Sequence, residues 1–183
     1  MTGQHLEPLA AAYHASENVG YPIEPVSGSR MAMFSGSFGN DYQKFHAKDL
    51  MTMPKGHATG TGPSAHVDTA CSSSLMALHL ACQFIRNGES SLQWGFMAII
   101  GLGTVLAIDN LGILSKDSRS FSFDERRNGY GRGEGVGSLI VRPLGDAIAN
   151  GDNIRALIRS TGSNQDGKTP AITKPSMERQ EGL

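Results

Sequence analysis

One short segment constrains the fold more than any other part of the chain. Residues 67–75 read VDTACSSSL, so a β-forming run leads into Cys71, and small residues and a helix-forming stretch follow it. This order predicts a strand, a turn and a helix, with the thiol at the helix N-terminus. Unpaired backbone N–H groups and the helix dipole favour a thiolate there. A thiolate on a strand-to-helix turn is typical of nucleophiles in acyl transfer.

Strand and helix patterns alternate along the chain, which predicts an α/β fold. Alanine and leucine at helical spacing predict a first helix over residues 6–19. Short helices are predicted over residues 42–50 and 143–150, and residues 97–108 fit either a strand or a buried helix. The remaining strands are predicted over residues 30–34, 65–69, 137–141 and 154–161. In the helix after Cys71, a buried face is predicted at Leu75, Leu78, Cys82 and Ile85.

Composition narrows the class of protein. The chain has 183 residues, 39% hydrophobic and 18% charged, which indicates one globular domain. A net charge of −1 argues against a nucleic-acid partner. The two cysteines, eleven residues apart, match neither a metal site nor a disulfide scaffold. No signal peptide is visible, and the longest apolar stretch falls short of the ~20 residues of a membrane helix, so we expect a reduced, cytoplasmic setting.

Three separated motifs carry a family resemblance. The segment around Cys71 resembles the active-site segment of β-ketoacyl synthases, in particular the ketosynthase domain of type I polyketide synthases. The helix that follows Cys71 continues this first motif, and the other two are the stretch FSFDERRNGYGRGEG at residues 121–135 and the loop at residues 162–170, in the family's order. The resemblance implies a thiolase-like layered α/β/α/β/α fold. It covers about the first half of a ketosynthase, so residues 1–183 are expected to form a partial domain, truncated before the C-terminal half.

The resemblance also implies a chemistry. In the family, the cysteine takes an acyl group from the phosphopantetheine arm of an acyl carrier protein. Two downstream histidines then assist decarboxylation of a malonyl thioester for carbon–carbon bond formation in polyketide or fatty acid biosynthesis. Only Cys71 carries over as catalytic; substrate-binding residues stay unassigned, and no metal or directly bound cofactor is expected. The implied partners are an acyl carrier protein, acyl and malonyl thioesters and, in the complete domain, a second copy.

The sequence departs from the family pattern in two places, which keeps a second hypothesis open. Gly62 runs directly into Pro63, where the family has a further segment, and residues 91–97 replace its Gly-Gly strand. The alternative is a catalytically inactive ketosynthase remnant that acts at most as a carrier-protein or subunit binding module. This chain alone is expected to form no condensation product and to be poorly soluble, because apolar edges stay uncovered.

A third, minor hypothesis is a P-loop nucleotide-binding protein. Residues 162–169 match the pattern G-x-x-x-x-G-K-T after a predicted strand. A P-loop must open a helix, whereas Pro170 follows at once and Pro175 comes five residues later. A tight turn is the better interpretation, with Asn164 and Asp166 bonding the backbone and Gly167 at positive φ.

Other conspicuous residues have structural interpretations. Cys82 is predicted to fill the core, and His79 to be a buried histidine hydrogen-bonded to a neighbour. His66 is predicted to lie on the strand face opposite Cys71. The alternating glycines of residues 129–137 indicate close backbone approach, with Arg132 and Glu134 pairing on the other face, and Asp124 and Arg126 as turn partners.

Overall fold

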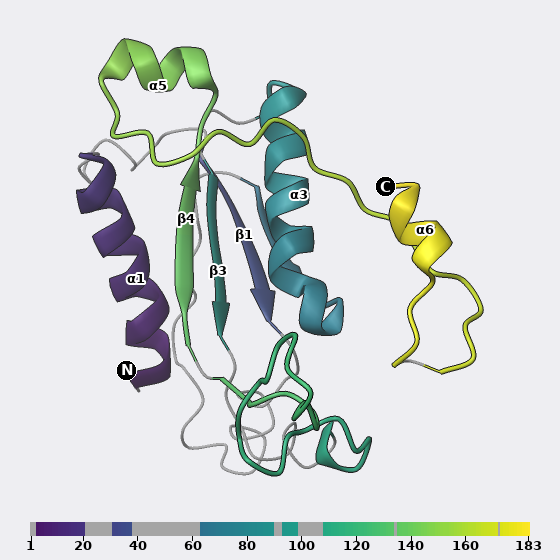
Figure 1. Ribbon diagram of the computed structural model, residues 1–183. Coiled ribbons are helices and arrows are strands. Elements are labelled where there is room, and N and C mark those ends of the chain that lie inside the picture. The colour runs from purple at the N-terminus through teal and green to yellow at the C-terminus, as the bar shows by residue number, and fades with distance from the viewer. Residues whose placement is uncertain are drawn as a thin grey trace, which may run out of the picture.

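The computed structural model describes residues 3–20, 31–37, 63–89, 93–98, 108–133, 135–171 and 173–183. A four-stranded sheet lies between the helix Gly3–Val19 on one side and the helix Ser73–Arg86 on the other (Figure 1). The helices are α1 (Gly3–Val19), the 3-10 turn η3 (Ala70–Ser72), α3 (Ser73–Arg86), α5 (Leu144–Asn150) and α6 (Met177–Glu181). The strands are β1 (Ala32–Ser37), β2 (Ser64–Val67), β3 (Gln93–Ala98) and β4 (Gly137–Val141). The predicted α/β class is confirmed for these residues.

The sheet places the turn after β2 at a defined edge. Its strand order is β2-β1-β3-β4, with β1 parallel to β2 and β3, and β4 antiparallel to β3. The carboxyl ends of the three parallel strands therefore meet at one edge, and β4 begins at that edge. Helix α3 links β2 to β3, so its N-terminus starts there as well.

The contact between α3 and the sheet is built from small side chains. Ala32 and Phe34 of β1 form a buried cluster with Ala77 and Ala81 of α3. Small residues four positions apart let the helix approach the strands closely. The predicted buried face is wrong at Leu75, which is 70% exposed, because the stripe toward the sheet starts two positions earlier on the helix, at Ser73, and continues through Ala77 and Ala81.

Several predicted elements are confirmed and two are corrected. Strand β4 matches its predicted position, and α5 lies within the helix predicted over residues 143–150. Helix α1 ends at the predicted residue and begins three residues earlier than predicted. Strand β1 continues through Gly36 to Ser37 instead of ending at residue 34. Residues 154–161, predicted as a strand, do not join the sheet that the described residues form. The predicted helix over residues 42–50 lies outside the described residues. Of residues 97–108, predicted as either a strand or a buried helix, the first two end strand β3 and residues 99–107 lie outside the described ranges.

Residues 152–161 instead form an extended strap that crosses from the α1 side of the sheet to α3 (Figure 1). Side-chain hydrogen bonds hold it to the helices on both sides. The guanidinium of Arg155 donates to Asn18 Oδ1 of α1 at 2.8 Å, and His79 Nδ1 of α3 lies 2.9 Å from Thr161 Oγ1.

No helix in the described ranges is both long and apolar enough to cross a membrane.

The glycine-rich stretch shows close approach at only two positions. A Cβ on Gly129 would lie 2.5 Å from the carbonyl carbon of Leu114, and one on Gly131 would lie 2.5 Å from the Ser118 carbonyl oxygen. At the other three alternating glycines, no atom of the described residues lies within 4 Å of the Cβ position, so the prediction of one close-packed glycine face is wrong there for Gly133, Gly135 and Gly137.

The predicted partnership of Asp124 and Arg126 is confirmed. Arg126 Nη2 lies 2.8 Å from Asp124 Oδ2, and this contact lowers the pKa of the Asp124 carboxyl. The predicted pair of Arg132 and Glu134 lies outside the described residues at Glu134.

Candidate active site at the start of helix α3

Cys71 lies where the sequence predicts it. Strand β2 ends at Val67, the 3-10 turn η3 covers Ala70–Ser72, and α3 begins at Ser73. The thiol therefore stands at the entrance to a helix, at the edge of the sheet where the parallel strands end. Its residue is exposed, so a reagent or substrate has access to the sulfur.

The turn before Cys71 is strained. Ala70 has a φ of 56°, a left-handed conformation that side chains with a Cβ disfavour. Its N–H donates to Asp68 Oδ1 at 3.0 Å, which satisfies the backbone of the turn. Strain of this kind persists only where surrounding contacts hold it, and it is concentrated at functional sites.

A buried serine holds the same turn from the other side. The hydroxyl of Ser73 accepts a hydrogen bond from the Thr69 N–H at 2.9 Å and donates one to the Ala70 carbonyl at 2.6 Å. Gly36 of β1 lies directly against this helix start, because a Cβ on Gly36 would lie 2.5 Å from the Ser73 carbonyl carbon. Sequence reasoning missed both residues; the available signal was a glycine inside a buried strand.

The two histidines near Cys71 in sequence have other partners. His79 is half-buried rather than fully buried, and its predicted hydrogen bond to a neighbour is confirmed by the contact with Thr161. His66 is exposed, with its ring 2.9 Å from Ser35 Oγ and 3.3 Å from Ser37 Oγ. Among the described residues, neither histidine makes a hydrogen bond to Cys71.

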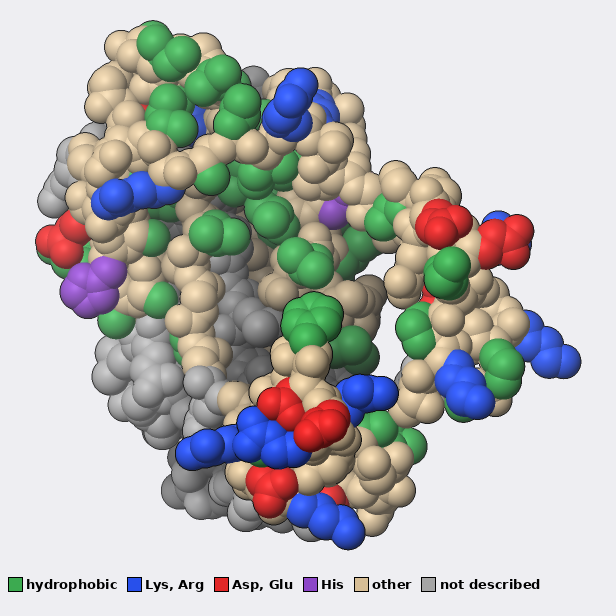
Figure 2. All heavy atoms as spheres, viewed as in Figure 1, with side chains coloured by type: hydrophobic (Ala, Val, Ile, Leu, Met, Phe, Trp, Pro, Cys, Tyr) green, Lys and Arg blue, Asp and Glu red, His purple; other side chains and the backbone are tan. Residues whose placement is uncertain are grey.

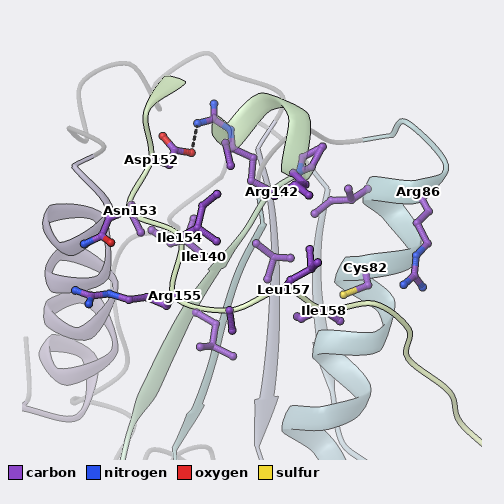
Figure 3. A pocket seen from close by; sticks show the side chains of 18 residues that line it. Cys82, Arg86, Ile140, Arg142, Asp152, Asn153, Ile154, Arg155, Leu157 and Ile158 are labelled. Atoms are coloured by element: carbon purple, nitrogen blue, oxygen red, sulfur yellow. Dashed lines mark hydrogen bonds and ion pairs between the residues drawn. The ribbon is translucent and has the colours of Figure 1, made fainter. Parts of the chain in front are cut away.

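A cavity of about 360 Å³ lies at the other end of α3 (Figure 3). It is bounded by β4, the strap and the last turns of α3, and Cys82 lines it whereas Cys71 does not. Arg142 Nη1 and Asp152 Oδ2 form an ion pair of 2.8 Å at its rim. Hydrophobic side chains gather at the surface there (Figure 2), including the exposed Leu139 and Leu157.

Two other kinds of site, a metal site and a P-loop, are not found in the described part of the chain. The described part of the chain holds no group of three potential metal ligands. Residues 162–171 contain no helix, and α6 begins only at Met177, so the helix that a P-loop needs is missing there. Gly167 has the predicted positive φ, 70°, and the Asn164 amide donates to the Arg179 carbonyl.

The two thiols should react at different rates. Cys71 is exposed, whereas Cys82 is 5% exposed, and burial raises the pKa of the Cys82 thiol. Because the thiolate is the reacting form, iodoacetamide near neutral pH should alkylate Cys71 faster by about tenfold or more. Peptide mapping over a time course measures both rates. Equal rates, or faster labelling of Cys82, would contradict the placement of Cys71 on an open turn.

Comparison with known proteins identifies a sequence family and several similar proteins. The sequence family described as "Beta-ketoacyl synthase, N-terminal domain" matches residues 1–147. The highly reducing polyketide synthase azaB of Aspergillus niger is 45% identical over 201 residues, which cover 100% of this chain and 8% of that protein. The 6-hydroxymellein synthase cdmE of Talaromyces verruculosus is 44% identical over 193 residues, which cover 96% of this chain and 7% of that protein. The chain thus spans less than a tenth of these relatives.

Solved structures agree with the fold. The ketosynthase from module 6 of the bacillaene synthase of Bacillus subtilis 168 matches with a TM-score of 0.86 and 32% identity, over 100% of this chain and 34% of that one. The oxazolomycin ketosynthase domain OzmH KS7 of Streptomyces albus JA3453 matches with a TM-score of 0.84 and 30% identity, over 96% and 34%. The thiolase-like fold expected from the sequence is confirmed over this part of such a domain.

Proposed function

Because the chain belongs to the β-ketoacyl synthase family, as the N-terminal part of a ketosynthase domain, we propose that Cys71 is the nucleophile that receives an acyl group. The observation that carries this proposal is the exposed thiol at the entrance to α3, next to a strained Ala70. A strained turn costs stability, so it is expected where a reacting group must be held in one place.

The proposed step is thioester exchange. The Cys71 thiolate attacks the carbonyl carbon of an acyl thioester, and the new carbon–sulfur bond forms as the bond to the pantetheine sulfur breaks. The pantetheine thiolate leaves and takes up a proton from water. The backbone N–H of Cys71, at the start of the helix, is our candidate donor to the oxyanion of the tetrahedral intermediate.

In the whole protein, the acyl group on Cys71 is the electrophile for a carbanion released by decarboxylation of a malonyl thioester. We propose that an acyl carrier protein delivers both thioesters on phosphopantetheine, that the complete domain is a homodimer and that it works in the cytoplasm. We assign no role in decarboxylation to His66 or His79, whose rings are hydrogen-bonded to Ser35, Ser37 and Thr161.

Acylation by a small thioester tests this proposal without a carrier protein. The purified chain is incubated with the acetyl thioester of N-acetylcysteamine, and the intact mass and peptide map are followed over time. We expect one acetyl group per chain, on the peptide that contains Cys71, released by neutral hydroxylamine. A folded chain that stays unmodified, or is modified first at Cys82, would contradict the proposal and favour the non-catalytic binding module.

A further inference from the structure

We propose that Ser73 is a positioning residue for the acylation of Cys71, and that it acts through Ala70 without touching the substrate. The inference rests on the proposed role of Cys71. Ser73 is fully buried, with 0% exposure, and its hydroxyl bonds to the two residues that precede the thiol. It accepts from the Thr69 N–H at 2.9 Å and donates to the Ala70 carbonyl at 2.6 Å.

These two hydrogen bonds restrain the residue whose conformation sets the direction of the chain into Cys71. Ala70 has a φ of 56°, and an alanine released from restraint returns to negative φ. Asp68 Oδ1 provides a third restraint on the same residue, through the Ala70 N–H at 3.0 Å. The turn is therefore held by contacts on both sides of Ala70.

Ser73 is itself fixed relative to the sheet. The Cα of Gly36 lies so close to the helix start that an added Cβ would be 2.5 Å from the Ser73 carbonyl oxygen and 2.7 Å from the Ser74 nitrogen. Strand β1 thereby sets the position of Ser73, Ser73 sets the conformation of Ala70, and Ala70 places the thiol. A serine that only filled space would pack against Gly36, but it would not make the hydrogen bonds to Thr69 and Ala70.

Replacement of the hydroxyl has a calculable consequence. Ser73→Ala leaves the Thr69 N–H and the Ala70 carbonyl without this partner, so Ala70 relaxes out of the left-handed region in most molecules. We expect the acylation rate at saturating thioester to fall about tenfold, which corresponds to about 1.4 kcal/mol. The thioester concentration for half-maximal rate should change less than about twofold, because the buried hydroxyl does not contact the substrate.

A double-mutant cycle with Ala70→Gly separates positioning from packing. Glycine adopts positive φ about as readily as negative φ, so it does not need the hydroxyl to stay in the left-handed region. In the Ala70→Gly background, Ser73→Ala should slow acylation only about twofold. A purely structural serine would instead give the same factor in both backgrounds, because its effect would not depend on the φ preference of residue 70.

Ser16 supplies the matched control. It is a second fully buried serine, on α1, and its hydroxyl donates to the Ala12 carbonyl at 3.1 Å. Ser16→Ala should lower the melting temperature to a similar extent as Ser73→Ala, with less than a twofold effect on acylation. An equal loss of acylation rate in the two variants would overturn the proposal, and so would an additive cycle.

A substitute variant and a substitute measurement cover the cases in which Ser73→Ala does not fold or the parent chain is not acylated. If Ser73→Ala does not fold by circular dichroism, the cycle is run with Ser73→Thr, which adds no second thiol near Cys71 and disturbs the geometry of the two hydrogen bonds through its extra methyl group. If the parent chain is not acylated, that result contradicts the proposed function, and the cycle is measured on alkylation of Cys71 by iodoacetamide. Coupling of less than twofold in that measurement contradicts the role of Ser73 independently.

Discussion

Replacing Cys71 by alanine is expected to remove acyl transfer from this chain. Cys71 is the one exposed thiol among the described residues, and the acyl group has no other sulfur in an open position. Loss of a nucleophile leaves only the uncatalysed background, so the rate of acyl-adduct formation should fall at least about a thousandfold. Intact mass spectrometry after incubation with the acetyl thioester of N-acetylcysteamine measures the loss.

Cys82→Ala is the matched control for this variant. It removes the same chemical group from the buried face of α3, where the thiol lines a cavity and has a raised pKa. It should lower stability by roughly 1 kcal/mol through lost packing and leave acylation of Cys71 within about twofold. An acyl adduct that survives Cys71→Ala and disappears with Cys82→Ala would reverse the assignment of the nucleophile.

A single added methyl group at Gly36 is expected to have the largest effect on folding. The Cβ of Gly36→Ala would lie 2.5 Å from backbone atoms of Ser73, which cannot rotate away. Helix α3 must then move off strand β1, which opens the contact of Phe34 with Ala77 and Ala81. We expect a loss of at least about 2 kcal/mol in the free energy of unfolding, or roughly 4 to 8 °C in melting temperature.

Gly145→Ala tests the opposite case. Gly145 lies in α5, and a Cβ there meets no atom within 4 Å. Alanine favours the helix, so this variant should be neutral or more stable by up to about 1 kcal/mol. Thermal unfolding followed by circular dichroism compares the two variants. Equal melting temperatures would show that α3 does not pack against Gly36 as closely as described.

The sequence predicts the position of the proposed nucleophile, but it does not predict the residues that hold the turn around it. The strand, the turn and the helix around Cys71 follow from local patterns, because short β-forming runs and helical spacing are properties of neighbouring residues. The support comes from Gly36, which is 35 positions earlier and meets Ser73 only after the sheet has formed. A single sequence does not state which strand will lie beneath a given helix.

The error at Leu75 has a related cause. Apolar spacing identifies large side chains as the core face, but here the close contact is made by Ala77 and Ala81. The wrong strand at residues 154–161 reflects a β-forming run, IRALIRST, that pairs with none of the strands among the described residues. Secondary structure in sheets is decided by pairing, and pairing is not a local property.

The strap also connects helix α1 to a segment that is translated much later. The hydrogen bond from Arg155 to Asn18 joins residues 137 positions apart. Helix α1 otherwise contacts β3 and β4, and β4 begins only at Gly137. At about 5 to 20 residues per second, α1 waits roughly 7 to 27 seconds after its own translation before Arg155 has been added. Helix α1 is thus translated well before the last of the residues that contact it, and a ribosome-bound chain exposes part of its surface to chaperones throughout that interval.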